Sequence, residues 1–292
     1  MRLTDPHLLA EMLHARPLEL PSFLFRRLQE QMASSPSGVA LSKFKDVTYP
    51  VDMSLHAISR KYYFHTHEMY LERVFRETLQ RGDTFIDIGA NMGYWSAFSA
   101  ALVGREGEIH AFEPVPQFFE SLDRFARANP SYRIHANRMA IGAGETTLPM
   151  AVVEPNAQNY ENFMINIGAS SLLPGFLDHA AELTRTIHVK VNSLDDYVRR
   201  HNIDVAKIGL IKIDVEGFES YCLDGMTSIL EKPGKKTPIL CEVLTDKNRR
   251  EPLDGRATIE RLERHGYICL NALTYRPVDR LRLRFEENIL CV

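Results

Sequence analysis

The apolar positions of the chain follow a helical spacing in its first eighty residues. Residues 21–34 and 67–83 have apolar side chains near the helical period, which predicts a helix in each range. Residues 46–54 predict a short edge strand, because the proline in this run cannot donate a hydrogen bond within a sheet. We therefore expect a mostly helical N-terminal extension at residues 1–65, followed by the main domain at residues 66–292.

From residue 83 onward, short apolar runs alternate with amphipathic segments. Strands are predicted at 83–89, 108–114, 132–142, 208–214, 237–243, 266–273 and 287–292, and helices at 91–104 and 116–130. Alternation of this kind predicts an α/β fold, in which a parallel sheet is built through right-handed crossovers and has helices on both faces. The runs at 208–214 and 237–243 contain few polar residues, as expected for strands that helices cover on both sides.

The alternation stops between residues 142 and 193. Residues 146–155 and 186–194 predict two further strands, and the loop at 156–175 between them is long and polar. Irregular loops of this length within a compact domain are often functional. We expect a β-rich insertion at about 142–193, with its loop acting as a lid over the acceptor.

Composition narrows the classes of function. The chain has 292 residues, of which 45% are hydrophobic and 25% charged, so it can bury a full core. The net charge of −3 argues against a surface that binds nucleic acid. No run reaches the roughly 20 apolar residues of a membrane span, and the first fifteen residues lack the unbroken apolar run of a secretory signal. We expect a cytoplasmic protein.

The four cysteines suggest neither a zinc site nor a disulfide framework. Cys222, Cys241, Cys269 and Cys291 lie far apart and include no C-x-x-C pair. Free thiols in a reducing compartment are expected instead. The string of His65, His67 and Glu68 is a weak indication of metal binding, and a solvated helix start explains it better. No metal is expected.

A glycine-containing loop follows the strand at 83–89. Asp87, Gly89, Asn91 and Gly93 fit the pattern acid-x-Gly-x-Gly/Asn-x-Gly, whereas the dinucleotide fingerprint requires glycines where Asn91 and Tyr94 stand. Asn91 tolerates the left-handed backbone that the middle position needs. The loop resembles the S-adenosylmethionine (SAM) loop of class I methyltransferases, in which Asp87 would supply a negative field to the ammonium group. Asp87 as a balance for the helix dipole is the alternative.

Two later strand ends fit an adenosine. Glu113 ends the next strand, 26 residues after Asp87, where an acid accepts both ribose hydroxyls. An ordinary solvated acid before a proline is the alternative. Asn137 and Ala140 follow the third strand, where this fold lines the adenine, although simple termination of the strand explains them nearly as well.

Charged residues crowd the carboxyl end of the strand at 208–214. Lys212, Asp214, Glu216 and Glu219 follow one another there, at the edge where open α/β sheets bind ligands. Charges beside an apolar strand are costly unless they are paired or in use. A structural ion pair between Lys212 and Glu219 is the alternative to a catalytic role.

Several segments together resemble the FkbM-type methyltransferases. They are residues 87–96, 110–119, 193–198, 211–219, 223–226, 238–243 and 287–292. Members of this family are SAM-dependent O-methyltransferases that act on hydroxyls of sugars, glycolipids or polyketide-type natural products. The resemblance implies a seven-stranded sheet of order 3-2-1-4-5-7-6 with one antiparallel strand, and it does not reach residues 1–65.

The resemblance also implies roles for the residues of the site. The loop from Asp87 to Gly93 would hold the methionine part of SAM, and Glu113 the ribose. Asp214 would face the methyl group as the general base, beside Glu216 and with Lys212 paired to an acid. In the alternative, Glu216 is the base and Asp214 holds Lys212.

Two further positions, the partner and the alternative functions complete the expectations from the sequence. Ser193 with Asp196 three residues later resembles a capping box, and Glu242 ends the fifth strand, where substrate would lie. The partner would be a small-molecule or glycan acceptor with a free hydroxyl, and a homo-oligomer is an open expectation. The alternative functions are an NAD-dependent oxidoreductase on a related fold and a non-catalytic SAM-binding protein.

Overall fold

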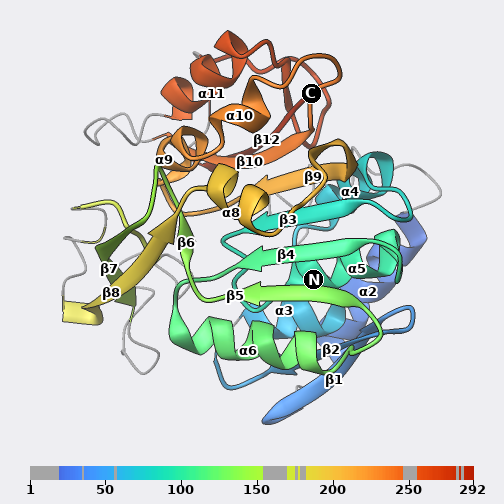
Figure 1. The fold of residues 1–292 in the computed structure, drawn as a ribbon. Helices are drawn as coiled ribbons and strands as arrows, with labels where there is room; N and C mark the ends of the chain where they lie inside the picture. The colour runs from blue at the N-terminus through green and yellow to red at the C-terminus, as the bar shows by residue number, and fades with distance from the viewer. Residues whose placement is uncertain are drawn as a thin grey trace.

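A seven-stranded sheet forms the centre of the computed structural model (Figure 1). The structure describes residues 20–34, 36–55, 58–153, 170–174, 177, 182–245, 255–280, 283 and 286–292. The strands are β3 (Thr84–Ile88), β4 (Glu108–Phe112), β5 (Arg133–Asn137), β9 (Ile208–Ile213), β10 (Ile239–Leu244), β11 (Cys269–Asn271) and β12 (Glu286–Cys291). From β5 the order is β5-β4-β3-β9-β10-β12-β11, and β12 alone runs antiparallel to its neighbours. This is the 3-2-1-4-5-7-6 order that the resemblance implied, so the α/β prediction is confirmed.

Helices lie on both faces of the sheet (Figure 1). They are α4 (Glu72–Thr78), α5 (Tyr94–Val103), α6 (Pro116–Arg127), α8 (Leu194–Arg200), α9 (Glu219–Asp224), α10 (Thr227–Leu230) and α11 (Gly255–Arg264), with 3₁₀ turns at Met69–Leu71 and Val205–Lys207. Helix α5 ends at Gly104 as predicted, and its Trp95 stacks on Phe75 at 4.3 Å between ring centroids. The predicted cap of α8 is confirmed, because Ser193 Oγ accepts from Asp196 N at 3.1 Å.

Helix α4 ends earlier than the spacing predicted. Leu79 already has an extended backbone, and its N–H donates to the carbonyl of Phe75. Gly82 falls within the range predicted as helix, but it lies in the turn before β3 with φ +86°. The helical pattern thus ran past the true end by about one turn, because extended residues before a strand can keep apolar positions at a similar spacing.

The insertion forms a separate three-stranded sheet. Its strands are β6 (Ala140–Ile141), β7 (Thr146–Val153) and β8 (Thr184–Asn192), and β8 pairs with both others. The two strands predicted here are confirmed, whereas residues 156–169, most of the predicted lid, lie outside the described residues. Ser171, just after that range, donates its hydroxyl to the carbonyl of Glu216 at 2.7 Å, so the insertion contacts the charged end of β9.

The described part of the N-terminal extension contains a β-hairpin as well as helices. It comprises α2 (Leu20–Met32), β1 (Val39–Phe44), β2 (Val47–Asp52) and α3 (Ile58–Phe64). The strand expected at 46–54 is present as β2, and it pairs with β1, which the apolar spacing did not predict. Val47, Tyr49 and Val51 are fully buried and belong to the same hydrophobic cluster as the central sheet. The hairpin is therefore packed into the core and is not a separate unit.

The cysteines are all free and buried, but two of them meet. Cys269 and Cys291 are register partners on β11 and β12, with their Sγ atoms 2.6 Å apart. These two cysteines are therefore close together in space although they are far apart in the sequence. In the part of the chain that the structure describes, no helix has the length and apolar character needed to cross a bilayer.

Candidate functional site

The glycine loop makes a tight turn against the end of β9. Gly89, Asn91 and Gly93 all have positive φ angles, of 79°, 51° and 83°. A side chain at position 89 cannot be accommodated, because its Cβ would lie 1.8 Å from the backbone oxygen of Asp214. The Asp214 N–H donates to the carbonyl of Ile88 at 3.0 Å, which fixes the loop to the charged cluster. The left-handed backbone predicted for Asn91 is confirmed.

Asp87 lies beneath this loop, almost fully buried. Its Oδ2 accepts a hydrogen bond from Ser96 Oγ at 2.6 Å, in the first turn of α5. Its Oδ1 is buried and has no hydrogen-bond partner among the described residues. Burial raises the pKa of Asp87, although the charge of Lys212 and the hydroxyl of Ser96 oppose the rise. An unpaired buried carboxylate oxygen under a glycine loop suits a cationic ligand, while the contact with α5 also agrees with the dipole alternative.

Glu113 joins the glycine loop to the end of β4. One carboxylate oxygen accepts from Asn91 N and the other from Val115 N, both at 2.8 Å. The side chain is 5% exposed, so the alternative of an ordinary solvated acid is wrong. Burial raises the pKa of Glu113 to about 7, although the two N–H donors lower it. Each oxygen retains a further lone pair with which it can accept a hydroxyl.

The residues expected beside the adenine lie on two different sheets. Asn137 ends β5, and its amide donates to the carbonyls of Ala111 and His135 at 3.2 and 2.9 Å. Ala140 is buried in β6, where it pairs with Val191. The chain therefore leaves the central sheet between these two residues.

Lys212 and Asp214 form an ion pair at the carboxyl end of β9. The Lys212 Nζ to Asp214 Oδ2 distance is 2.6 Å, and the Lys212 side chain is 4% exposed. Burial alone would lower the pKa of Lys212, but the charges of Asp214 and Asp87 outweigh it and raise this pKa. The proposed pair between Lys212 and Glu219 is wrong. Instead, Glu219 Oε1 accepts from Gly217 N at 2.9 Å, and burial raises the pKa of Glu219 to about 7.

Glu216 and Glu242 lie beside Asp214. One carboxylate oxygen from each of the three residues lies within 4.8 Å of the other two. Glu216 has a φ of +52°, a strained backbone for a residue other than glycine, and strain of this kind often marks functional sites. Burial and the charge of Asp214 raise the pKa of both Glu216 and Glu242 well above the usual range.

Glu68 also belongs to this end of the sheet, although sequence reasoning placed it at a solvated helix start. It pairs with His67 at 3.2 Å and accepts a hydrogen bond from Asn288 at 3.1 Å. Burial raises the pKa of Glu68, but the charges of His67 and Lys212 outweigh burial and lower it to about 2. The only signal in the sequence was that Glu68 is an acid within a histidine-rich string. This signal does not show that Glu68 lies beside β9 and β12.

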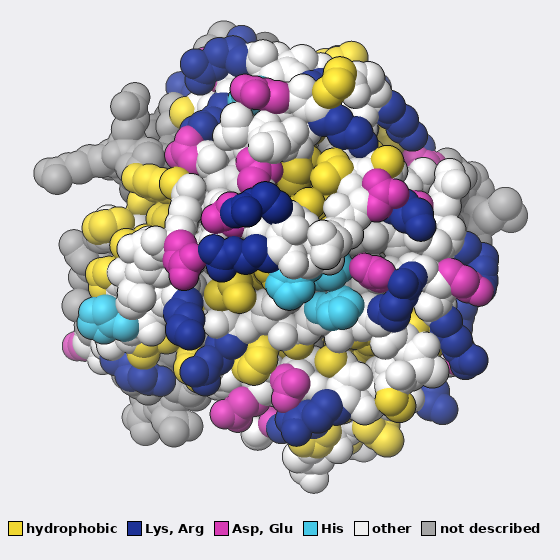
Figure 2. All heavy atoms as spheres, viewed as in Figure 1, with side chains coloured by type: hydrophobic (Ala, Val, Ile, Leu, Met, Phe, Trp, Pro, Cys, Tyr) yellow, Lys and Arg dark blue, Asp and Glu magenta, His cyan; other side chains and the backbone are white. Residues whose placement is uncertain are grey.

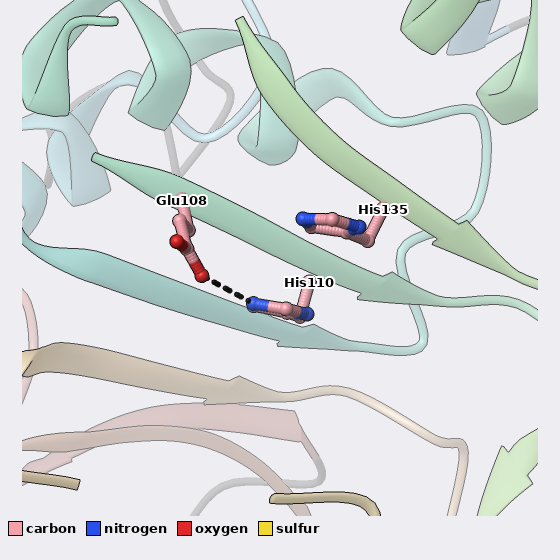
Figure 3. Close-up of side chains that lie close together, drawn as sticks. All are labelled: Glu108, His110 and His135. Carbon is pink, nitrogen blue, oxygen red and sulfur yellow. Dashed lines mark hydrogen bonds and ion pairs between the residues drawn. The ribbon is translucent and has the colours of Figure 1, made fainter. Parts of the chain in front are cut away.

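A second group of donor atoms lies on the central sheet, further back along β4 and β5 (Figure 3). Glu108, His110 and His135 point to a common region, with His110 Nε2 and Glu108 Oε2 3.2 Å apart and the two imidazole rings stacked at 4.5 Å. His110 Nδ1 also lies 3.1 Å from the hydroxyl of Tyr197. Burial and the neighbouring His135 lower the pKa of His110 to about 4. Histidines gather near the middle of the face in Figure 2, where basic and acidic side chains are interspersed.

Several solved methyltransferase structures are similar to this chain at low sequence identity. No curated protein matches the chain. An FkbM methyltransferase structure from Methylobacillus flagellatus is 14% identical, with a TM-score of 0.40 over 94% of this chain, and the chain spans 59% of its length. A fibrillarin from Aeropyrum pernix with bound S-adenosyl-L-methionine is 11% identical, with 90% and 86% of the two chains covered and a TM-score of 0.43. A precorrin-6y C5,15-methyltransferase from Geobacter metallireducens is 14% identical, with 86% and 96% covered and a TM-score of 0.42.

The family assignment comes from the sequence match. Residues 87–269, more than half of the 292-residue chain, match the family model described as the methyltransferase FkbM domain. The matched range runs from the acid under the glycine loop to the start of β11, so it includes both the loop and the charged end of β9. The chain therefore belongs to the FkbM methyltransferase family.

Proposed function

We propose that the protein is a SAM-dependent O-methyltransferase that acts on a hydroxyl of a sugar, a glycolipid or a natural product. The observation that carries this proposal is the contact between the glycine loop and the carboxylate cluster. Position 89 has no room for a Cβ against the backbone of Asp214. A ligand held by the loop would thus lie next to carboxylates that can accept a proton.

The residues of the loop suit SAM. Asp87 would attract the ammonium group with its negative charge, Gly89, Asn91 and Gly93 would let the methionine part approach the backbone, and Glu113 would accept the ribose hydroxyls. Asn137 and Ala140 would line the adenine. When bound, SAM supplies a methyl group on a sulfonium centre, whose carbon–sulfur bond breaks as the acceptor oxygen bonds to the methyl carbon.

The acceptor's proton needs a base, and two carboxylates are placed to take it. One oxygen of Asp214 pairs with Lys212, and the side chain is 31% exposed, so it is partly accessible to an acceptor. Glu216 has a raised pKa, which makes it the stronger base once it is ionised. Lys212 holds one oxygen of Asp214 in place, so Asp214 would combine this structural role with that of the base, and Glu216 is the alternative base.

The other functions are less well supported. Family membership and the residues at positions 91 and 94 favour a methyltransferase over an NAD-dependent oxidoreductase. A non-catalytic SAM-binding protein would have no need for several buried carboxylates with raised pKa values, because they destabilise the ionised state. Titration calorimetry with SAM and with NAD distinguishes a methyltransferase from an oxidoreductase. Transfer of a labelled methyl group from SAM to a panel of hydroxylated acceptors distinguishes a methyltransferase from a non-catalytic SAM-binding protein.

Substitution of Asp214 tests the choice of base. Asp214→Asn should lower turnover by roughly 10²–10⁴-fold while SAM affinity changes less than about threefold. Because Lys212 then loses its closest partner, the melting temperature should also fall, and Lys212→Met in the same chain should restore part of it. Near-normal turnover in Asp214→Asn, together with loss of turnover in Glu216→Gln, would assign the proton to Glu216.

A further inference from the structure

Three carboxylates converge at the edge of the sheet where β9 and β10 end. Asp214 and Glu216 come from the turn after β9, and Glu242 from β10, with one oxygen of each within 4.8 Å of the others. Glu242 is 8% exposed, whereas Asp214 and Glu216 are partly exposed. The group is thus a three-oxygen corner that is buried at Glu242 and reaches the surface at the other two side chains.

Among the residues that the structure describes, too little positive charge faces this corner. Within the described part of the chain, no residue donates a hydrogen bond to the carboxylate of Glu216 or Glu242, although Glu242 is more than nine-tenths buried. Lys212 is already 2.6 Å from Asp214, and Glu286 adds a further negative charge to both glutamates. A buried carboxylate without a partner is costly, so the corner needs either protons or a cation.

We propose that Asp214, Glu216 and Glu242 bind a divalent metal cation of the hard type, such as Mg²⁺, Mn²⁺ or Ca²⁺. Such ions prefer oxygen ligands only, and Mg²⁺ and Mn²⁺ sites commonly combine a few carboxylates with water and substrate. Because Asp214 and Glu216 are partly exposed, water or substrate could supply those further ligands. This proposal replaces the expectation from the sequence that the protein holds no metal.

The position of the ion would bear on the reaction, a consequence that rests on the proposed function. Asp214 lies against Gly89, so an ion on its carboxylate is next to the loop assigned to SAM. A hydroxyl bound to a divalent cation loses its proton more readily. The proton would go to a carboxylate oxygen that does not bind the ion, and the hydroxyl oxygen would bond to the methyl carbon as the carbon–sulfur bond breaks and its electron pair leaves with the sulfur.

The other donor group differs in chemistry. Glu108, His110 and His135 offer two imidazoles, which suit Zn²⁺ or other transition metals, and both nitrogens of His110 already have hydrogen-bonding neighbours (Figure 3). Arg133 also pairs with Glu108 at 2.7 Å. This group has partners without a metal, so it serves as a control for the location of binding.

Titration of Mn²⁺ into the chelator-treated full chain tests the proposal, with binding followed by calorimetry and by loss of the electron paramagnetic resonance signal of free Mn²⁺. The wild type should bind Mn²⁺, with release of protons that is visible as a dependence of the heat on the buffer. Glu242→Gln should weaken binding at least about tenfold. Glutamine has the shape of the protonated glutamate, so folding should be kept, and Glu216→Gln provides a second variant with the same expectation.

Two controls separate ligation from general attraction. Glu286→Gln removes a nearby negative charge but no donor atom, and should change the affinity less than about threefold. His135→Ala removes a donor of the other group and should leave Mn²⁺ binding unchanged. No binding at millimolar Mn²⁺, an equal loss in Glu286→Gln and Glu242→Gln, or loss in His135→Ala would overturn the proposal. Absence of SAM binding or methyl transfer beside intact Mn²⁺ binding would instead overturn the proposed function alone.

Discussion

At the scale of single residues, the glycine loop depends on Glu113 as much as on its glycines. The carboxylate accepts backbone hydrogen bonds from both Asn91 and Val115, so it orders the loop before any ligand arrives. Pre-ordering of this kind reduces the entropy that binding must overcome. The same side chain therefore shapes the site and contacts the ligand in the proposed function.

Replacement of this carboxylate should weaken SAM binding. Glu113→Gln presents an amide N–H₂ group where an oxygen accepted before, and a charge-assisted hydrogen bond is worth on the order of 1.5–3 kcal/mol. We expect the affinity for SAM, measured by titration calorimetry, to fall roughly tenfold or more. The melting temperature without ligand shows how much of the loss comes from the loop itself. Unchanged SAM affinity would contradict the assignment of Glu113 to the ribose hydroxyls.

Gly89 is required for steric reasons. A methyl group here would collide with the backbone oxygen of Asp214 at 1.8 Å, and φ is +79°, which side chains rarely adopt. Gly89→Ala should therefore lower the free energy of unfolding by at least about 2 kcal/mol and weaken SAM binding as well. Gly144→Ala is the matched control, since nothing lies within 4 Å of its added Cβ. Equal stability of the two variants in urea unfolding would contradict this account of the loop.

At the scale of elements, the N-terminal hairpin contacts the glycine loop of the candidate site. Tyr49 of β2 donates its hydroxyl to the carbonyl of Met92, within the glycine loop, at 3.3 Å. Asn129, just after α6, exchanges two hydrogen bonds with Thr48, at 2.8 and 2.7 Å. The hairpin is thus connected both to the loop and to the helix that follows β4.

Loss of the Asn129 contact should loosen the hairpin. The side chain is 4% exposed and also donates to the carbonyl of Phe125, so Asn129→Ala leaves several backbone groups without partners. We expect a loss of about 2–3 kcal/mol in unfolding free energy and faster hydrogen exchange over residues 39–52. Thr274→Ala, at an exposed turn with a single weak hydrogen bond from Arg276 N, should leave exchange over residues 39–52 unchanged. If exchange there stays slow in Asn129→Ala, apolar packing alone holds the hairpin.

An element could be predicted from the sequence when its pattern of buried side chains was distinctive. The strands of the central sheet were predicted because both of their faces are covered, which leaves continuous apolar runs such as residues 208–213. Strand β1 alternates between exposed and buried positions, yet contains Ser42 and Lys43 and is only six residues long. It is recognisable only once β2 is known to lie beside it.

The candidate site shows the same limit. Lys212, Asp214 and Glu216 were predicted as a group because they are close together in the sequence, at the end of β9 and in the turn that follows it. Glu242 was expected near the substrate because it ends the fifth strand, but the convergence of Glu68 on this group depends on contacts between distant segments, which spacing along the chain does not contain. Likewise, the sequence does not show which carboxylate the Lys212 side chain can reach. Its partner is Asp214 and not the alternative Glu219.

At the scale of the whole molecule, the distribution of charge matters more than its total. The net charge is only −3, but several carboxylates are buried at one edge of the central sheet. Burial raises the pKa of Glu113 and Glu219 to about 7, and that of Glu216 and Glu242 well above the usual range. Without a cation, the folded protein therefore holds protons that the unfolded chain has released.

This arrangement predicts that the carboxylates cost stability as the pH rises, and Glu219 isolates the effect. Its folded-state pKa of about 7 exceeds the usual 4.5, so its favourable contribution is present below pH 4.5 and is lost as the pH rises through 7. Glu219→Gln cannot ionise and keeps an oxygen to accept from Gly217 N. Relative to the wild type, its unfolding free energy should rise by about 3 kcal/mol at pH 8 but by less than about 1 kcal/mol at pH 5. Urea unfolding at the two pH values measures this difference, with Glu106→Gln, whose side chain is 67% exposed, as a control that should show no such change. A gain in Glu219→Gln that is equal at both pH values would mean that packing, and not ionisation, sets the effect of this residue.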